Sequence, residues 1–171
     1  MRRLERVGMA VAAAATTAGV LVIGACAQQV PGTALADRTE LSAYASAVTS
    51  SAAAGRATDS ACDAFRTANG SSVRAFHVYI DASNSKGVDD PETKRKADSA
   101  VTTLRDNAHS VDQSVTGSVP SAIAYPLGAY RDDTNALADT LAREPDTDTL
   151  NAVIAEFNAA KDDALTACST H

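Results

Sequence analysis

The sequence has few large side chains from which to build a core. Its 171 residues include no tryptophan, three phenylalanines and four tyrosines. No run of alternating apolar and polar residues is long enough for a strand, and residues 78–80 are the only short β-leaning patch. We therefore expect an all-α fold with a thin, alanine-rich core, in which helices approach closely but bury little area per residue.

The sequence also lacks the motifs that carry common enzyme chemistry. It contains no Gly-x-Ser-x-Gly nucleophile elbow and no glycine-rich phosphate-binding loop. The three histidines, His77, His109 and His171, do not have the spacing of metal ligands within a helix. We accordingly expect a protein that is not an enzyme and that needs no cofactor or metal.

Positive charge is scarce as well. The chain has 15 basic and 21 acidic residues, which gives a formal net charge of −6 at pH 7. An acidic surface repels nucleic acid and anionic lipid headgroups. We therefore expect no nucleic-acid partner, and any attachment to a membrane has to come from something other than surface charge.

The N-terminus has the three parts of a secretory signal peptide. Three arginines among the first six residues precede an apolar stretch over residues 7–23, and small residues follow it. The sequence Ile-Gly-Ala-Cys at residues 23–26 resembles the bacterial lipobox, in which the cysteine thiol receives a diacylglycerol and the chain is cleaved before it. The resemblance implies a lipoprotein signal peptide over residues 1–25 and a lipid anchor on Cys26, on the extracytoplasmic face of the cell membrane.

Two other interpretations of this segment stay open. It could be an ordinary signal peptide that is cut after Ala34 or Ala36, or an uncleaved membrane helix, although its many alanine, glycine and threonine residues make it only modestly apolar. Cleavage before Cys26 removes three arginines and one glutamate, so the net charge of the mature chain becomes about −8. The anchor would then come from acyl chains, which hold firmly when two or more are present.

Lipid on Cys26 leaves Cys62 and Cys168 as an even pair. Paired cysteines in an exported protein indicate a disulfide. Their separation of 106 residues would close a loop that spans most of the domain.

Residues 26–57 are predicted to form the lipidated N-terminus and a tether. Asp37 can cap a marginal helix through Leu41, Tyr44 and Val48, but past Thr49 the pattern dissolves into serine, alanine and glycine. A marginal helix followed by flexible chain and a fully disordered tether are both compatible with this composition.

From Thr58 onward the apolar spacing becomes regular and predicts four helices. The first starts at a Thr58 or Asp59 cap, is weakened at Gly70 and ends near Gly87; the second starts at Pro91 behind Asp90. The third follows Pro120 and either kinks or begins at Pro126; the fourth starts near residues 146–148. The apolar stripes predicted for the four helices are, in order, Cys62, Phe65, Asn69, Val73, Phe76 and Ile80; Ala97, Val101, Leu104, Ala108, Val111 and Val115; Ile123, Leu127, Tyr130, Thr134, Leu137 and Leu141; and Leu150, Ile154, Phe157, Lys161, Leu165 and Cys168.

Four helices with short loops pack most simply as an up-down-up-down bundle over residues 58–171. In that topology the start of the first helix and the end of the fourth lie at the same end. Cys62 and Cys168 occupy those two places, each on its helix's apolar stripe, so the fold allows the disulfide without further assumption.

The layout of lipobox, tether and four helices with terminal cysteines looks like that of small uncharacterised lipoproteins of mycobacteria and related actinobacteria. That resemblance implies a place in the cell envelope and no particular activity. Our first hypothesis is a non-enzymatic, lipid-anchored helical module that binds an envelope partner. The alternative is a carrier of a small hydrophobic ligand or haem, because exported actinobacterial haem-binding proteins have a similar layout; His77, Tyr79 and His109 are then the candidate ligand-binding residues.

Overall fold

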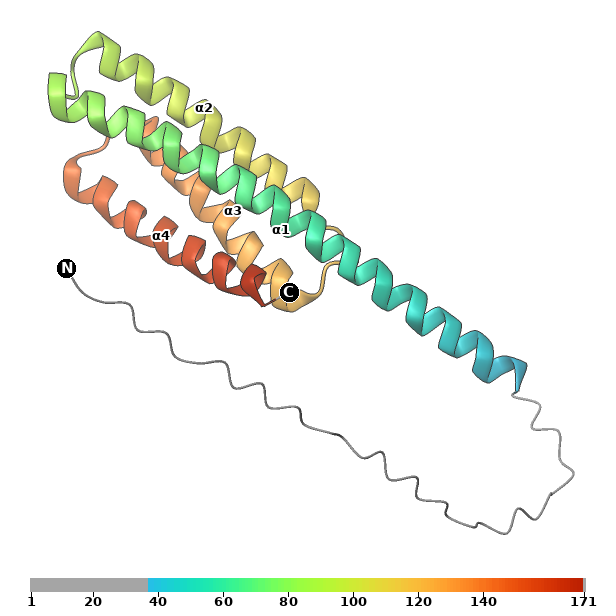
Figure 1. The fold of residues 1–171 in the computed structure, drawn as a ribbon. Helices are drawn as coiled ribbons and strands as arrows, with labels where there is room; N and C mark the ends of the chain where they lie inside the picture. Colours follow the sequence, from blue (N-terminus) through green and yellow to red (C-terminus); the bar gives the residue numbers. More distant parts are fainter. Residues whose placement is uncertain (1–36, 171) are drawn as a thin grey trace, which may run out of the picture. The chain divides into compact units, whose positions relative to one another are not determined.

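The computed structural model describes residues 37–170, which form four α-helices and no strand (Figure 1). The helices are α1 (Arg38–Lys86), α2 (Pro91–Ser114), α3 (Ser121–Leu141) and α4 (Thr147–Ser169). The predicted signal peptide, the predicted lipid anchor at Cys26 and residues 27–36 lie outside the described residues.

Aspartate side chains cap three of the four helices at their N-termini. The carboxylates of Asp37, Asp90 and Asp146 accept hydrogen bonds from backbone N–H groups of the first turn that follows each of them. Such caps satisfy donors that have no partner inside the helix. At the other end of α1, Gly87 has a φ of 87°, a conformation that glycine adopts without strain. The sequence thus marks where most of these helices begin.

The helices form the predicted up-down-up-down four-helix bundle (Figure 1). Helix α1 packs along α2, α2 along α3, and α3 along α4. Helix α4 approaches the backbone of α1 at few places only. The bundle is therefore closed along three sides and loosely closed along the fourth, the seam between α1 and α4.

Three aromatic rings fill the centre of the core. Tyr130 of α3 is fully buried, and its ring centroid lies 4.9 Å from that of Phe65 and 5.6 Å from that of Phe157. The Phe65 ring meets Tyr130 edge to face, an arrangement that aromatic pairs prefer. These rings join α1, α3 and α4 at one level, where alanines alone would leave space.

Beside the rings lies a small buried polar cluster. The amide Nδ2 of Asn107 on α2 donates a hydrogen bond of 2.9 Å to the Oγ of Ser72 on α1, which is fully buried. The Thr134 hydroxyl on α3 donates to the backbone oxygen of Tyr130. The cluster ties α1 to α2 through side chains that the apolar pattern of the sequence does not reveal.

The predicted apolar stripes agree best with the structure for α3 and α2. All six stripe residues of α3 are buried, and the four central ones of α2 are too. In α4 the predicted Leu165 is exposed and its neighbour Ala164 is buried. In α1 the smaller residues Ala61, Ala68 and Ser72 face the core, whereas the predicted Val73, Phe76 and Ile80 are half-buried. Val73, Phe76 and Ile80 therefore lie along the seam with α4, whereas Phe65 of the same helix lies in the core.

The structure corrects the predicted start of the first helix and decides between the two alternatives for the third. Helix α1 begins at Arg38 and runs without interruption past Thr58 and Gly70, so residues 38–57 are helical and not a marginal helix followed by flexible chain or a disordered tether. Thr58, the expected first residue, is instead the first buried one. Helix α3 begins at Ser121, directly after Pro120 as predicted, and Pro126 lies inside it, so the alternative of a start at Pro126 is wrong.

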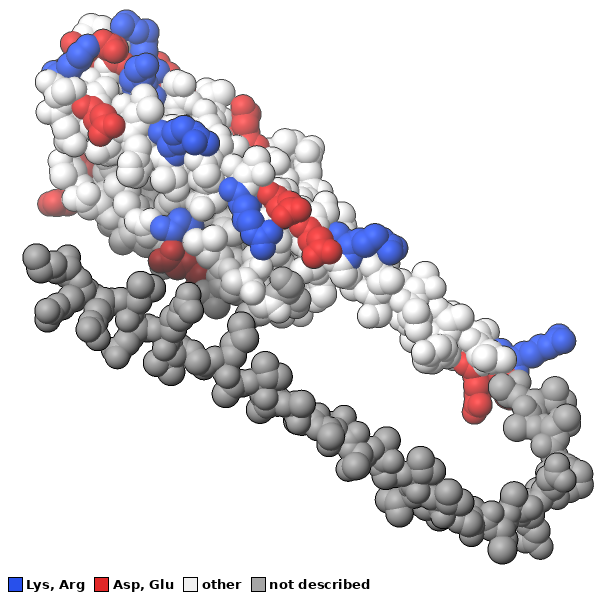
Figure 2. Space-filling model, viewed as in Figure 1, with Lys and Arg blue, Asp and Glu red and all other residues white. Residues whose placement is uncertain are grey.

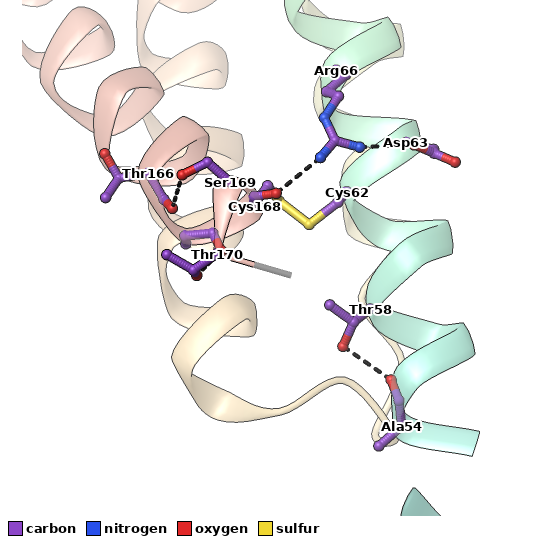
Figure 3. Close-up of a disulfide and its surroundings, with 10 residues drawn as sticks. Ala54, Thr58, Cys62, Asp63, Arg66, Thr166, Cys168, Ser169 and Thr170 are labelled. Carbon is purple, nitrogen blue, oxygen red and sulfur yellow. Dashed lines mark hydrogen bonds and ion pairs between the residues drawn. A yellow bond between two sulfur atoms is a disulfide. The ribbon is translucent and has the colours of Figure 1, made fainter. Parts of the chain in front are cut away.

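The predicted disulfide joins Cys62 to Cys168, with 5.6 Å between the two Cα atoms (Figure 3). Both cysteines are buried. One guanidinium nitrogen of Arg66 donates to the backbone oxygen of Cys168 at 2.9 Å, and the other contacts the carboxylate of Asp63. The C-terminus of α4 is thus fastened to α1 at the end of the seam where the bundle begins.

Candidate functional site

The first candidate surface is the projecting segment, residues 38–57 of α1, which extends beyond the other three helices (Figure 1). Every residue from 37 to 52 is exposed. Three large apolar side chains, spaced three and four residues apart, lie along it: Leu41, Tyr44 and Val48 are 55%, 72% and 50% exposed. That spacing places them on one face of the helix.

The projecting segment has no charge along most of its length. Arg38 and Glu40 stand at its tip and Arg56 at its base, and no charged residue lies between positions 41 and 55. Figure 2 shows this stretch as an uncharged surface between charged ends. A surface helix that stays in water usually carries charged side chains opposite its apolar stripe. The projecting segment instead has only uncharged side chains between positions 41 and 55, both on its apolar stripe and opposite it.

Local interactions support the helical form of the segment but are weak. Asp37 caps it, alanine favours helix, and the hydroxyls of Ser46 and Thr49 bond back to carbonyls four residues earlier. Because the segment continues a helix that the bundle already holds, it extends from an existing nucleus and does not have to nucleate on its own.

The second candidate surface is the α1–α4 groove in the loosely closed seam. It has a volume of about 220 Å³ and is open to solvent. Leu137 and Phe157, both buried, lie at its base. Its remaining lining residues come from α1 and α4: Val73, Phe76, His77, Ile80, Ile154, Asn158 and Lys161. The groove exists because these two helices stay apart away from the disulfide.

Polar groups stand only at the edges of this groove. Lys161 on α4 has a side chain that is 22% exposed, and its Nζ donates to the Oδ1 of Asn158 at 3.0 Å. The carboxylate of Asp162 lies 3.4 Å from the same ammonium group and is mostly exposed. His77 on α1 is exposed and lines the groove as well. A cation thus sits beside an apolar surface in an acidic protein.

The three residues predicted to bind a ligand do not come together. His77 lines the α1–α4 groove, whereas Tyr79 is buried and lines a different hollow, of about 160 Å³, near Val88 and Lys94. His109 is exposed on α2, where its ring nitrogen Nε2 lies 2.9 Å from the Nε2 of Gln113. The structure therefore forms no single haem or ligand site from this set.

Sequence reasoning did not single out Lys161 as a residue of the groove, although a signal was present. Lys161 occupies a position on the apolar stripe predicted for α4, between Phe157 and Leu165. A lysine on such a stripe buries its methylene chain and keeps its ammonium group at the edge. That pattern points to an apolar surface with a cationic rim.

Within residues 37–170, acidic, histidine and cysteine side chains form no group of three or more that could hold a metal ion. None of the described helices is long and apolar enough to cross a membrane. Burial raises the pKa of the Tyr130 phenol, and the nearby Ser72 and Thr134 hydroxyls partly oppose the shift. Tyr130 lies in the closed core and reaches neither candidate surface.

Comparison with known proteins identifies a family. No curated protein and no solved structure matches the chain. The family model described as the Rv2240c four-helix bundle domain matches residues 38–169. The match starts at the first residue of α1 and ends at the last residue of α4, so it includes the projecting segment. The chain belongs to the Rv2240c four-helix bundle domain family.

Proposed function

We propose that this protein is a lipid-anchored, non-enzymatic module on the extracytoplasmic face of the cell membrane, and that it binds a partner protein of the cell envelope through the projecting segment. The observation that carries the proposal is the exposed face of Leu41, Tyr44 and Val48 on an uncharged helix. Exposed apolar patches of this kind mark sites of interaction.

The packing of the bundle favours a protein partner over a ligand held inside. The central side chains, among them Tyr130, Phe65 and Leu104, are completely buried, which indicates a solid core. The hollows on the bundle, of about 160, 220 and 460 Å³ among others, are open to solvent, so none of them encloses a ligand within the core. The scattered positions of His77, Tyr79 and His109 do not favour haem either.

The projecting segment would bind its partner by helix-to-helix packing. Leu41, Tyr44 and Val48 repeat at the spacing with which a helix presents anchors to a partner helix or groove. Alanine and glycine at positions 45, 52 and 55 let another backbone approach closely. The family match includes this segment as part of the domain, which supports a role beyond that of a linker.

A photo-crosslinking experiment in intact cells tests the protein partner. A benzophenone amino acid is placed at Tyr44, and, as the matched control, at Ser46, which lies on nearly the opposite face of the same exposed helix. We expect a discrete adduct from position 44, no such adduct from position 46, and loss of the adduct in a Leu41→Ser, Val48→Ser double variant. Equal labelling from both positions, or none from either, contradicts the proposal.

The lipid anchor has its own test. Cells are fed an alkyne-tagged fatty acid, and the wild-type protein is compared with a Cys26→Ala variant. We expect the wild type to carry the label and to sediment with membranes, and the variant to lose both properties. Label on the Cys26→Ala protein, or an unlabelled wild type, contradicts a lipid anchor at this residue.

A further inference from the structure

We infer that the α1–α4 groove binds a single-chain amphiphile with a carboxylate headgroup, such as a fatty acid. The chain would lie along Val73, Ile80 and Ile154, and the carboxylate would accept hydrogen bonds from Lys161 and His77 at the edge. This site lies on the bundle and does not depend on the projecting segment.

The shape of the groove limits the ligand to one chain. It is bounded by α1 on one side, by α4 on the other and by Leu137 of α3 below, and its volume of about 220 Å³ is too small for a bulky or two-chain molecule. Its base is apolar, since the side chains of Leu137 and Phe157 form it, and both are almost fully buried. Burial of methylene groups there gives favourable transfer free energy.

The positive charge of Lys161 at the edge of the groove favours a carboxylate headgroup. The protein as a whole is acidic, with a net charge of −6, so a cation beside an apolar groove is locally unusual. The Lys161 ammonium carries three N–H donors; Asn158 accepts one at 3.0 Å, and the neighbouring Asp162 is an exposed ion-pair partner at 3.4 Å. Exposed pairs of this kind are worth little. A carboxylate in the groove therefore gains an ion pair with the Lys161 ammonium, whereas an alcohol of the same length can accept a hydrogen bond but brings no opposite charge.

The architecture explains why the groove stays open. The disulfide between Cys62 and Cys168 fixes the separation of α1 and α4 at one end only. Toward the other end, where Phe76 and Ile154 line the groove, no such covalent link joins the two helices, and their backbones approach each other at few places. The seam can thus accept a chain without breaking the aromatic cluster of the core.

The test compares decanoate with decanol, which has the same chain and no charge, by titration calorimetry on the disulfide-bonded protein. We expect saturable binding of decanoate, and an affinity about tenfold lower in Lys161→Gln, because a charge-assisted hydrogen bond is lost. Decanol should bind more weakly than decanoate, and its affinity should change less than twofold in the same variant. Lys96→Gln, which removes the same charge from α2 outside the groove, is the matched control and should behave as wild type.

A second variant locates the site. Val73→Phe fills the groove from α1, and should abolish binding of both decanoate and decanol while the helical circular dichroism of the protein is unchanged. His77→Gln, on an exposed side chain, is a variant that leaves the core untouched and should weaken decanoate more than decanol. The inference is overturned by the absence of saturable decanoate binding, by equal effects of Lys161→Gln and Lys96→Gln, or by binding that persists in a folded Val73→Phe protein.

Discussion

At the scale of single residues, Tyr130 shows how this small core combines packing with an unsatisfied polar group. Its ring is buried between Phe65 and Phe157, and its hydroxyl has no hydrogen-bond partner among the described residues. The hydroxyls of Ser72 and Thr134 lie nearby without hydrogen-bonding geometry to it. A buried hydroxyl without a partner contributes nothing to stability and loses its hydration. The contribution of Tyr130 to stability therefore comes from the packing of its ring and not from its hydroxyl.

The substitution Tyr130→Phe tests this view. We expect the free energy of unfolding at pH 7 to stay within about 1 kcal/mol of wild type or to rise, because only the unpaired hydroxyl is removed. Tyr130→Ala should lower it by about 3–5 kcal/mol, because it leaves a cavity. Urea unfolding measures both, and a large loss in Tyr130→Phe would show that the hydroxyl is bonded after all.

The same variant predicts a dependence on pH. The pKa of Tyr130 is raised in the folded state, so the native protein holds this proton more tightly than the unfolded chain does. Its contribution is therefore complete below about pH 10, where a tyrosine of the unfolded chain ionises, and is lost as the pH rises above that value. Wild type should lose stability between pH 10 and pH 11 faster than Tyr130→Phe, and parallel pH curves would contradict this.

At this scale the sequence predicts core residues well and surface sites poorly. The position of Tyr130 on the α3 stripe predicted its burial correctly. The grouping of His77, Tyr79 and His109 was not borne out, because sequence spacing does not show which way neighbouring helices turn. Lys161 was visible on an apolar stripe, yet the meaning of its position depends on the distance between α1 and α4, which the sequence does not contain.

At the scale of helices, α1 differs most from its prediction. The expected start at Thr58 is where burial begins, and the real start at Arg38 lies 20 residues earlier. Hydrophobic periodicity reflects burial, and residues 38–52 are exposed, so this stretch lacks the strong apolar pattern that α2 and α3 carry. The Asp37 cap and the many alanines were the available signals, and they predicted only part of the helix.

Deletion of residues 38–52 tests how independent the projecting segment is. Since none of these residues is buried, we expect the thermal midpoint of the bundle to shift by no more than about 2 °C, while the helical circular dichroism signal falls. In the full-length purified protein, amides of this segment should exchange with solvent far faster than those of α3. Slow exchange there, or strong destabilisation by the deletion, would show that the segment packs against the bundle.

At the scale of the whole domain, the sequence predicted the topology and the disulfide together. Short loops favour alternating helices, and this alternation places Cys62 and Cys168 at the same end, where the structure joins them. The loosely closed seam was not predictable in this way. Helical periodicity tells which face of α4 is apolar, but not that the bulky Val73, Phe76 and Ile80 would keep it from closing on α1.

The disulfide should supply a large part of the stability of the domain. It closes a loop of 106 residues, and the chain-entropy model gives about 4–5 kcal/mol for a loop of that size. We expect a Cys62→Ala, Cys168→Ala double variant to lose about 3–5 kcal/mol in urea unfolding, and reduced wild type to resemble it. A loss below about 1 kcal/mol would mean that helix packing alone maintains the bundle.

Helix α1 is a single rod, and its length has a consequence for how the two surfaces can be used. At 1.5 Å per residue its 49 residues extend for about 74 Å, and Leu41 lies about 50 Å from Phe76 along the axis. That interval exceeds the diameter of a small domain, about 30 Å. If both proposals hold, occupancy at the tip and occupancy at the groove should be simultaneous and energetically additive, so a small protein domain bound at one end and an acyl chain bound at the other would not compete.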